Sequence, residues 1–174
     1  LYLPQPDEKT GIIPQFDGYF DLKEIDLSVY KNASVVGTIF HDYSGEDVQG
    51  MQAGKQADIV ELLYQMEDIT TPDNKAKNYV YYEARTLHDS SLSKAIHSIT
   101  ACDLGMEKEA YEMFMSAALT DLGQEMKSSD AGIHSANMGG VWQDVVMGFG
   151  GIRIRDGHLR IAPNCPKQWE KFTY

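Results

Sequence analysis

Apolar residues that recur at helical spacing constrain the fold of this chain more than any other feature of its sequence. Three runs follow the i, i+3, i+4, i+7 pattern that is typical of an amphipathic helix. They are Ile59, Leu62, Leu63 and Met66; Leu92, Ile96, Ile99 and Cys102; and Tyr111, Phe114, Ala118 and Leu122. The spacing therefore predicts three helices, each with one face turned toward a core.

Two further segments are predicted to contain helices. Residues 73–87 begin after Thr71-Pro72-Asp73, a helix-start signal, and residues 132–151 have a helical middle between glycine-rich ends. The connections between these segments are short, which favours antiparallel packing of neighbouring helices. The chain is therefore predicted to be mainly α, with an α/α architecture.

At Ile152 the spacing of apolar residues changes from the helical period of about 3.6 residues to a period of two residues. Apolar residues alternate with polar ones on both sides of Asp156-Gly157, which is the pattern of a β-hairpin with a tight turn. The apolar positions are Ile152, Ile154, Leu159 and Ile161. We therefore expect residues 1–150 to be mainly helical and residues 151–174 to begin a β-sheet domain.

Residues 1 to about 53 show neither period. Prolines at positions 4, 6 and 14 and glycines at positions 11, 18, 37, 45 and 50 interrupt short apolar stretches. So long an irregular segment is usually functional or rests on other parts of a protein. The chain also begins without methionine, so we expect it to have been cut from something longer.

The composition indicates a globular protein without a polyanionic partner. The chain has 174 residues, the size of one domain, and 43% of them are apolar, which is enough for a packed core. Its formal charge of −11 argues against nucleic acid and anionic membranes, since a negative surface gains nothing from counterion release. No run of about 20 apolar residues and no initial signal peptide is seen. We expect a cytoplasmic protein.

The two cysteines do not indicate a metal site or a disulfide. Cys102 and Cys165 lie far apart, without CxxC spacing and without histidines at metal-ligand intervals. We expect free, buried thiols. The sequence also contains no clustered His, Cys and Asp ligand set and no glycine-rich nucleotide loop after a strand, so we expect neither a metal nor an organic cofactor.

Polar residues concentrate in four motifs where packing does not require them. These are QFDGYF (15–20), GKQAD (54–58), LHDSSLS (87–93) and GIHSANMGG (132–140). Each motif lies in a loop or at the start of a predicted helix, where unpaired N–H groups and a partial positive charge favour a phosphate. Ser90 and Ser91 would add hydroxyl donors there, while His134 and Lys55 lie at two other helix starts. We hypothesise that these helix starts converge on one anion.

Each of these residues also has a structural explanation. Serine and aspartate in front of a helix commonly cap it by accepting hydrogen bonds from its first turn. A lysine at a helix start is usually solvated, and a histidine beside glycine is often a structural hydrogen-bond donor. Only the combination of motifs favours a binding site.

The motifs together resemble a known family. KQAD, HDSSLS followed by a helix, and GIHSANMGGVWQDVVMGFGG are similar to the closing third of the catalytic domain of glycoside hydrolase family 65. The opening DEKTGIIPQFDGYFDLKEIDL is similar to the segment that precedes those motifs in the family. Within the family, the sequences of these motifs resemble those of the kojibiose and glucosylglycerol phosphorylase branch most.

The resemblance implies a fold and an activity. The family fold is a toroid of paired inner and outer helices with flanking β domains, so the chain would be a partial α/α toroid, a fragment of a six-hairpin glycosidase-like barrel. The enzymes are inverting disaccharide phosphorylases, which convert an α-glucoside and inorganic phosphate to β-glucose 1-phosphate. The complete enzyme would be a homodimer, with phosphate as a co-substrate.

The resemblance also implies roles for individual residues. Ser90, Ser91 and His134 would bind phosphate, while Lys55 and Gln56 would bind the glucose whose anomeric carbon is attacked. His88 and Asp89 belong to the same motif as the serine pair, and the likeness gives them a supporting role but no direct ligand role. Phe16 and Tyr19 either support the sugar pocket or belong to the core.

Residue chemistry favours phosphorolysis over hydrolysis. An inverting glycosidase needs a second carboxylate to deprotonate water, but phosphate is already an anionic nucleophile and needs hydroxyl, imidazole and ammonium donors instead. No glutamate lies between Arg85 and Lys94. Asp89 would favour hydrolysis if it pointed into the site, so we expect it to point away and to cap a helix or orient His88.

One departure from the family pattern limits the expected activity. The family's general acid is a glutamate upstream of the matched segments, and no glutamate of this chain lies in a similar motif. We therefore expect no catalytic residue here, and an inactive chain without the remainder of the catalytic domain. Two alternatives remain: an inverting α-glucoside hydrolase of the same fold, and a non-catalytic helical scaffold or binding module.

Overall fold

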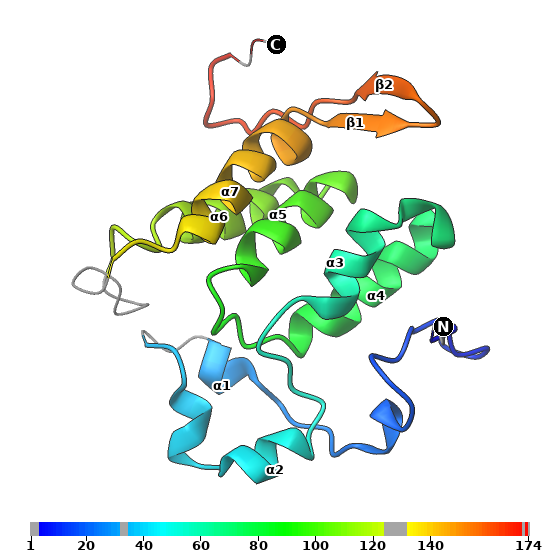
Figure 1. The fold of residues 1–174 in the computed structure, drawn as a ribbon, viewed down its shortest axis with the longest axis vertical. Coiled ribbons are helices and arrows are strands. Elements are labelled where there is room, and N and C mark those ends of the chain that lie inside the picture. Colours follow the sequence, from blue (N-terminus) through cyan, green and yellow to red (C-terminus); the bar gives the residue numbers. More distant parts are fainter. Residues whose placement is uncertain (1–3, 32–34, 124–131, 172, 174) are drawn as a thin grey trace. The chain divides into compact units, whose positions relative to one another are not determined.

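The computed structural model describes residues 4–31, 35–123, 132–171 and 173. The chain divides into two compact units, Leu1–Ser90 and Ser91–Tyr174, which are described separately. Within the described residues, helices predominate and one two-stranded sheet is present, so the mainly α class is confirmed (Figure 1). The expected division at residue 150, between a catalytic part and a β domain, stays a prediction.

The two longest helices of the first unit pack against each other. α3 (Asp58–Gln65) and α4 (Pro72–Ala84) lie side by side and are joined through the short 3-10 helix η3 (Glu67–Ile69) (Figure 1). Both helices were predicted, but α4 ends at Ala84 rather than at residue 87. The expectation that the first 53 residues are irregular is wrong in detail, because they contain short helical turns. These are η1 (Tyr19–Asp21), α1 (Ser28–Lys31), η2 (Thr38–His41) and α2 (Gly45–Gln49).

Local signals explain where α4 begins and what it holds. The Thr71 hydroxyl accepts a hydrogen bond from the backbone N–H of Asn74 at 3.2 Å, and Pro72 occupies the first turn, where no N–H is needed. On the buried face of the helix, the side-chain oxygen of Asn78 accepts a hydrogen bond from the N–H of Ile13 at 2.8 Å. This contact fixes the loop before η1 on α4.

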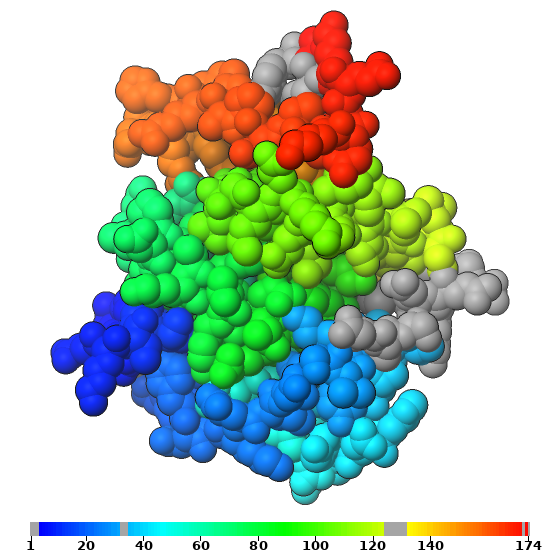
Figure 2. Space-filling model, turned by 180° about the vertical axis from the view of Figure 1, so that it is seen from behind, coloured from blue at the N-terminus to red at the C-terminus, as the bar shows by residue number. Residues whose placement is uncertain are grey.

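One helix of the second unit is enclosed by its neighbours. The unit contains α5 (Ser93–Asp103), α6 (Glu107–Ala118), α7 (Ser135–Gln143) and the π-helix η4 (Asp144–Phe149). α5 packs against the other three, and all of its residues except Lys94 and Asp103 are buried. α6 instead contributes much of the surface of this unit in Figure 2. α5 is therefore the central helix of its unit.

Periodicity predicted these helices correctly but not their ends. Leu92 precedes α5 and is exposed, and Leu122 follows α6 with 82% of its surface exposed. The buried face of α6 consists of Ala110, Phe114 and Ala117. The apolar period therefore continued beyond the hydrogen-bonded helix in both cases.

The predicted hairpin is present. Its strands are β1 (Ile152–Arg155) and β2 (His158–Ile161). Asp156 and Gly157 have φ values of 49° and 74°, as both central residues of a type I′ turn require. The register pairs Ile154 with Leu159, so the apolar side chains share one face, and both of these residues are exposed there.

A glycine determines the path of the chain into the hairpin. Gly151 has a φ of 61°, and a Cβ atom at this position would lie 1.8 Å from the carbonyl oxygen of Ala162. No residue with a side chain fits there without moving the backbone. Farther along, the Trp169 ring contacts those of Phe149 and Phe114, with centroid distances of 4.9 and 5.7 Å. This aromatic cluster fixes the segment after the hairpin on η4 and α6.

Candidate functional site

Two of the four polar motifs meet in the first unit. Gly54, the first residue of GKQAD, forms a parallel bridge with Thr86, which immediately precedes LHDSSLS. The Gly54 N–H donates to the carbonyl of Arg85 at 2.7 Å, and its carbonyl accepts from the N–H of Leu87 at 2.8 Å. Backbone hydrogen bonds therefore hold together two motifs that lie far apart in the sequence.

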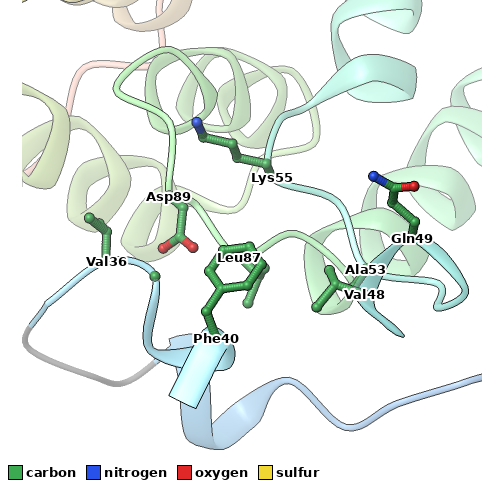
Figure 3. A pocket seen from close by; sticks show the side chains of 9 residues that line it. Val36, Phe40, Val48, Gln49, Ala53, Lys55, Leu87 and Asp89 are labelled. Carbon is green, nitrogen blue, oxygen red and sulfur yellow. The ribbon is translucent and has the colours of Figure 1, made fainter. Parts of the chain in front are cut away.

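A pocket of about 360 Å³ lies beside this bridge. Lys55 and Asp89 are its charged lining residues, and Figure 3 shows both toward one end of the pocket, with Gln49 toward the other. The remaining lining residues are Val36, Gly37, Phe40, Val48, Ala53 and Leu87. A mainly apolar pocket with a few convergent polar groups is the usual form of a small-molecule site.

We expect Asp89 to point away from the phosphate site and either to cap a helix or to orient His88, and its direction relative to a phosphate stays a prediction. Asp89 lines the same pocket as Lys55. The N-cap position of α5 is occupied by Leu92, which makes no side-chain capping hydrogen bond. The pocket therefore offers both a carboxylate acceptor and an ammonium donor to a polar ligand.

His88 is held by an ion-pair cluster. Its φ of 57° is in the left-handed region, which is uncommon for a residue with a side chain, and only 7% of its surface is exposed. The His88 Nε2 atom lies 3.6 Å from Oε1 of Glu83, which also accepts a hydrogen bond from Lys31 Nζ at 2.5 Å. These contacts make His88 an anchor of the loop that carries Asp89.

The same cluster determines the charge of Glu83. Burial alone would raise the pKa of this carboxyl, but hydrogen bonds and charge from His88 and Lys31 outweigh burial and hold the pKa at about 2. Glu83 is therefore ionised at neutral pH. Sequence analysis did not single it out, because nothing near Lys31 indicates a contact with a residue of α4.

The boundary between the two units falls, along the sequence, between the two serines of the pair. Ser90 is buried and ends the first unit, while Ser91 is partly buried and begins the second. Neither serine occupies the N-cap position of α5. Lys55 belongs to the first unit and His134 to the second, so the convergence of these residues on one anion stays a prediction. Gln56 is exposed beside Lys55.

His134 lies directly before α7, as predicted, and an aspartate holds it there. Its backbone N–H donates to Oδ2 of Asp121 at 2.8 Å, and its ring Nδ1 lies 2.6 Å from Oδ1. The His134 side chain is 32% exposed, whereas that of Asp121 is 10% exposed. Because Asp121 occupies Nδ1, Nε2 is the ring nitrogen that a ligand would contact. No motif marks Asp121 in the sequence.

The aromatic residues of QFDGYF lie apart from this pocket. Tyr19 is buried and contacts the rings of Phe16 and Tyr82, with centroid distances of 5.6 and 5.8 Å. Burial raises the pKa of its hydroxyl. Of the two interpretations of Tyr19, core packing therefore fits. Phe16 is exposed, and neither residue lines the pocket that contains Lys55; a sugar-supporting role for Phe16 stays a prediction.

The π-helix contains a buried acid that sequence analysis did not single out. Asp144 is fully buried, and neither of its carboxyl oxygens has a hydrogen-bond partner in the part of the chain that the structure describes. Burial raises its pKa to about 8. The nearby Ser98 offsets only part of this rise, since its hydroxyl donates to the carbonyl of Ala110 at 2.7 Å. Asp144 is therefore mainly protonated at neutral pH.

Both cysteines are free, but only Cys102 is buried, so the expectation of two buried thiols is wrong for the exposed Cys165. Burial raises the pKa of Cys102 to about 12, which makes its thiol unreactive. Among residues 4–31, 35–123, 132–171 and 173, no group of three or more His, Cys, Asp or Glu could hold a metal ion. In the same residues, no helix has both the length and the apolar character needed to cross a bilayer.

A family model described as "Glycosyl hydrolase family 65 central catalytic domain" matches residues 1–143. The chain belongs to glycoside hydrolase family 65. The resemblance seen in the motifs is thus confirmed. A kojibiose phosphorylase of Halothermothrix orenii is 46% identical over 100% of this chain and 22% of its own length. An α,α-trehalose phosphorylase of Geobacillus stearothermophilus is 42% identical, again over 100% of this chain and 22% of its own length.

A similar solved structure supports the assignment. It is described as "Putative kojibiose phosphorylase from human microbiome" and is 32% identical to this chain, with a TM-score of 0.85. The match covers 96% of this chain and 24% of the solved chain. This family 65 chain therefore spans less than a quarter of the length of the relatives named here.

Proposed function

We propose that this chain is part of an inverting glycoside phosphorylase, which cleaves an α-glucoside with inorganic phosphate to give β-glucose 1-phosphate. The observation that carries the proposal is that two family 65 relatives aligned over the whole chain are disaccharide phosphorylases, one for kojibiose and one for trehalose. The segment would supply the phosphate site and part of the glucose site. The remainder of the catalytic domain would supply the general acid.

In this proposal Ser90, Ser91 and His134 bind phosphate, and Lys55 and Gln56 bind glucose. Three observations support these roles. Lys55 lines a pocket of suitable size, Ser90 follows a loop that is anchored through His88, and His134 is held with its Nε2 atom directed away from its aspartate partner.

The proposed chemistry needs hydrogen-bond donors and no second carboxylate. A phosphate oxygen attacks the anomeric carbon from the side opposite the glycosidic oxygen, and the bond from that carbon to the oxygen breaks as the general acid protonates the leaving group. Configuration is inverted by this single displacement. Neutral hydroxyls and an imidazole hold the phosphate without repelling its negative charge. Phosphate acts as a co-substrate, and the proposal includes no metal or organic cofactor.

One observation favours a second candidate, an inverting hydrolase of the same fold. Asp89 lines the pocket with Lys55, and a carboxylate in that position could deprotonate a water molecule as an inverting glycosidase requires. The two candidates make different products, since a hydrolase releases glucose without consuming phosphate. Asp89→Asn would abolish hydrolysis by this route. It would not prevent phosphorolysis, because phosphate is the nucleophile there and needs no carboxylate base.

We also propose that residues 151–174 begin a β domain of the complete enzyme. The apolar face of the hairpin is uncovered, with Ile154 77% exposed, and an isolated two-stranded hairpin is marginally stable in water. Further strands would cover this face. The antiparallel helices would likewise continue as a toroid of helix pairs in the complete chain, which we propose to be a homodimer.

Product analysis of the complete protein tests the proposed function. Kojibiose, trehalose and other α-glucosides are incubated with and without inorganic phosphate, and the sugar products are identified by NMR. The proposal predicts phosphate-dependent cleavage and β-glucose 1-phosphate as the product. Glucose release without phosphate would identify the hydrolase, and absence of any cleavage would support a non-catalytic scaffold.

Substitution of the serine pair tests the phosphate site. Ser90→Ala with Ser91→Ala should raise the KM for phosphate roughly ten- to a hundred-fold, because hydrogen bonds to a charged group are lost, while the fold stays intact. Ser44→Ala provides a matched control, since the Ser44 side chain caps α2 by accepting from the N–H of Asp47. This control should cost about 1 kcal/mol of stability and leave the KM for phosphate unchanged. If the serine pair behaves like Ser44, its role is structural.

A further inference from the structure

The contact between Asp121 and His134 is a two-point contact. Asp121 follows α6, and its two carboxyl oxygens engage the backbone N–H and the ring Nδ1 of His134, at 2.8 and 2.6 Å. The carboxylate is largely buried, at 10% exposed, and the imidazole is three times as exposed, at 32%. The Nδ1 side of the histidine is therefore fixed within the second unit, while the side chain as a whole stays partly exposed.

This geometry selects one tautomer of the ring. An ionised carboxylate only accepts hydrogen bonds, so Nδ1 must carry a proton to satisfy the 2.6 Å contact. Nε2 is then an acceptor when the ring is neutral and a donor when it is protonated. Inorganic phosphate offers both P–OH and P–O⁻ groups near neutral pH, so an Nε2 atom fixed in this way can pair with either.

We propose that Asp121 is a positioning residue for phosphorolysis, which orients His134 so that Nε2 contacts the attacking phosphate. The inference rests on the proposed function, because only there is His134 a phosphate ligand. Asp121 touches neither substrate in this proposal. It acts only through the orientation and tautomer of His134, as carboxylates do for metal-bound histidines.

A purely structural role for Asp121 makes a different prediction. The hydrogen bond from the His134 N–H also resembles a cap at the start of α7, and loss of a cap costs stability of about 1 kcal/mol. Such a role would lower the melting temperature and leave the balance between the two substrates unchanged. The KM for phosphate relative to the KM for the glucoside therefore separates the two roles.

The test uses Asp121→Asn, His134→Asn and the double variant of the complete protein. Asparagine at position 134 keeps an N–H near the position of Nδ1, so it retains a donor toward Asp121, but it has no atom in the place of Nε2. We expect His134→Asn to raise the KM for phosphate by roughly a hundred-fold and Asp121→Asn by roughly ten-fold. The KM for the glucoside should stay within about two-fold. The double variant should be no worse than His134→Asn.

The outcomes distinguish the inference from the function on which it rests. If His134→Asn leaves the KM for phosphate unchanged, the proposed phosphate site is wrong. If His134→Asn has its effect but Asp121→Asn does not, or if the two effects multiply in the double variant, the positioning role is overturned while the phosphate site stands.

Two additional variants keep the test decisive. Asp103→Asn is the matched control, since Asp103 is in the same unit and pairs with Arg153 at 3.1 Å; it should leave both KM values unchanged. Asp121→Glu, which keeps the carboxylate, serves if Asp121→Asn does not fold. The inference requires that this variant raise the KM for phosphate more than that for the glucoside, and an equal rise in both would contradict it.

Discussion

Glu83 is a partly buried carboxyl group of the first unit and Asp144 a fully buried one of the second, and their surroundings differ. Glu83 accepts a hydrogen bond from Lys31 and faces His88, and its pKa is held at about 2 against the effect of burial. Asp144 has no hydrogen-bond partner for either oxygen among the described residues, and burial raises its pKa to about 8. Burial alone thus neutralises one acid, while two basic neighbours keep the other ionised.

The comparison has consequences for the roles of the two residues. Ionised Glu83 fixes the loop that carries Asp89 beside the pocket, whereas protonated Asp144 is compatible with the packing of α5 on the π-helix. The two groups should also make stability depend on pH with opposite signs. Substitutions can test each half of this comparison.

The largest effect is expected for Asp144→Asn at mildly alkaline pH. The folded-state pKa is raised from 3.8 to about 8, so the unfolded chain loses a proton that the folded chain keeps, and stability falls as pH rises from about 4 to about 8. Asparagine imitates the protonated acid. Stability should be unchanged near pH 4 and increase by about 2–4 kcal/mol at pH 8. Thermal unfolding of the complete protein between pH 4 and pH 8 measures this gain in stability. If Asp144→Asn is instead less stable than the unsubstituted protein at pH 8, Asp144 is ionised and paired.

Glu83→Gln should have the opposite sign and a smaller size. The folded-state pKa is lowered from 4.5 to about 2, so the contribution of Glu83 is present above about pH 4.5 and is lost as pH falls toward 2. Allowing for its partial exposure, we expect a loss of about 1–3 kcal/mol at pH 7 and less at pH 3. Urea unfolding at both pH values measures this difference. An equal loss at pH 7 and pH 3 would exclude a charge effect.

Lys31→Met should cost less, about 1 kcal/mol, because His88 still faces the carboxylate. The pKa of Glu83 should rise, so the acid-induced loss of stability should begin at a higher pH than in the unsubstituted protein. The double variant with Glu83→Gln should cost less than the sum of the two single changes, since the residues form one pair. Additive losses would show that they do not interact.

The smallest effect is expected for Glu112→Gln. Glu112 pairs with Lys108 at 3.7 Å, one helical turn apart on α6, and both side chains are largely exposed. An exposed pair of this kind contributes roughly 0.3–0.5 kcal/mol. The loss of stability in this variant therefore measures what an exposed ion pair contributes, for comparison with the partly buried pair at Glu83. If Glu112→Gln lowers the free energy of unfolding as much as Glu83→Gln does, burial does not explain the strength of the Glu83 pair.

Local structure could be predicted from the sequence wherever a short-range cause dominates. Thr71 and Pro72 mark the start of α4, and Asp156-Gly157 specifies the turn of the hairpin, because capping and left-handed turn conformations depend on a few neighbouring residues. The motifs were likewise sufficient for the family. The turns α1 and α2 were missed because they contain four and five residues, too few to show a period.

The contacts that organise the candidate site could not be predicted. Glu83 meets Lys31, which lies 52 residues earlier, and Asp121 meets His134 across 13 residues. Such pairings depend on tertiary packing, which propensity and periodicity do not encode. The π-helix that carries Asp144 is missing from the prediction for a similar reason, because its hydrogen-bond register differs from that of an α-helix by one residue and leaves the apolar pattern nearly unchanged.

The parallel bridge between Gly54 and Thr86 has a consequence for engineering. Since main-chain hydrogen bonds join the two loop segments at this point, a chimera that replaces the GKQAD loop with a foreign loop would have to keep the backbone pairing with residues 85–87. The grafted loop would keep this pairing only when both segments are transplanted together, with no insertion or deletion on either side of the junction.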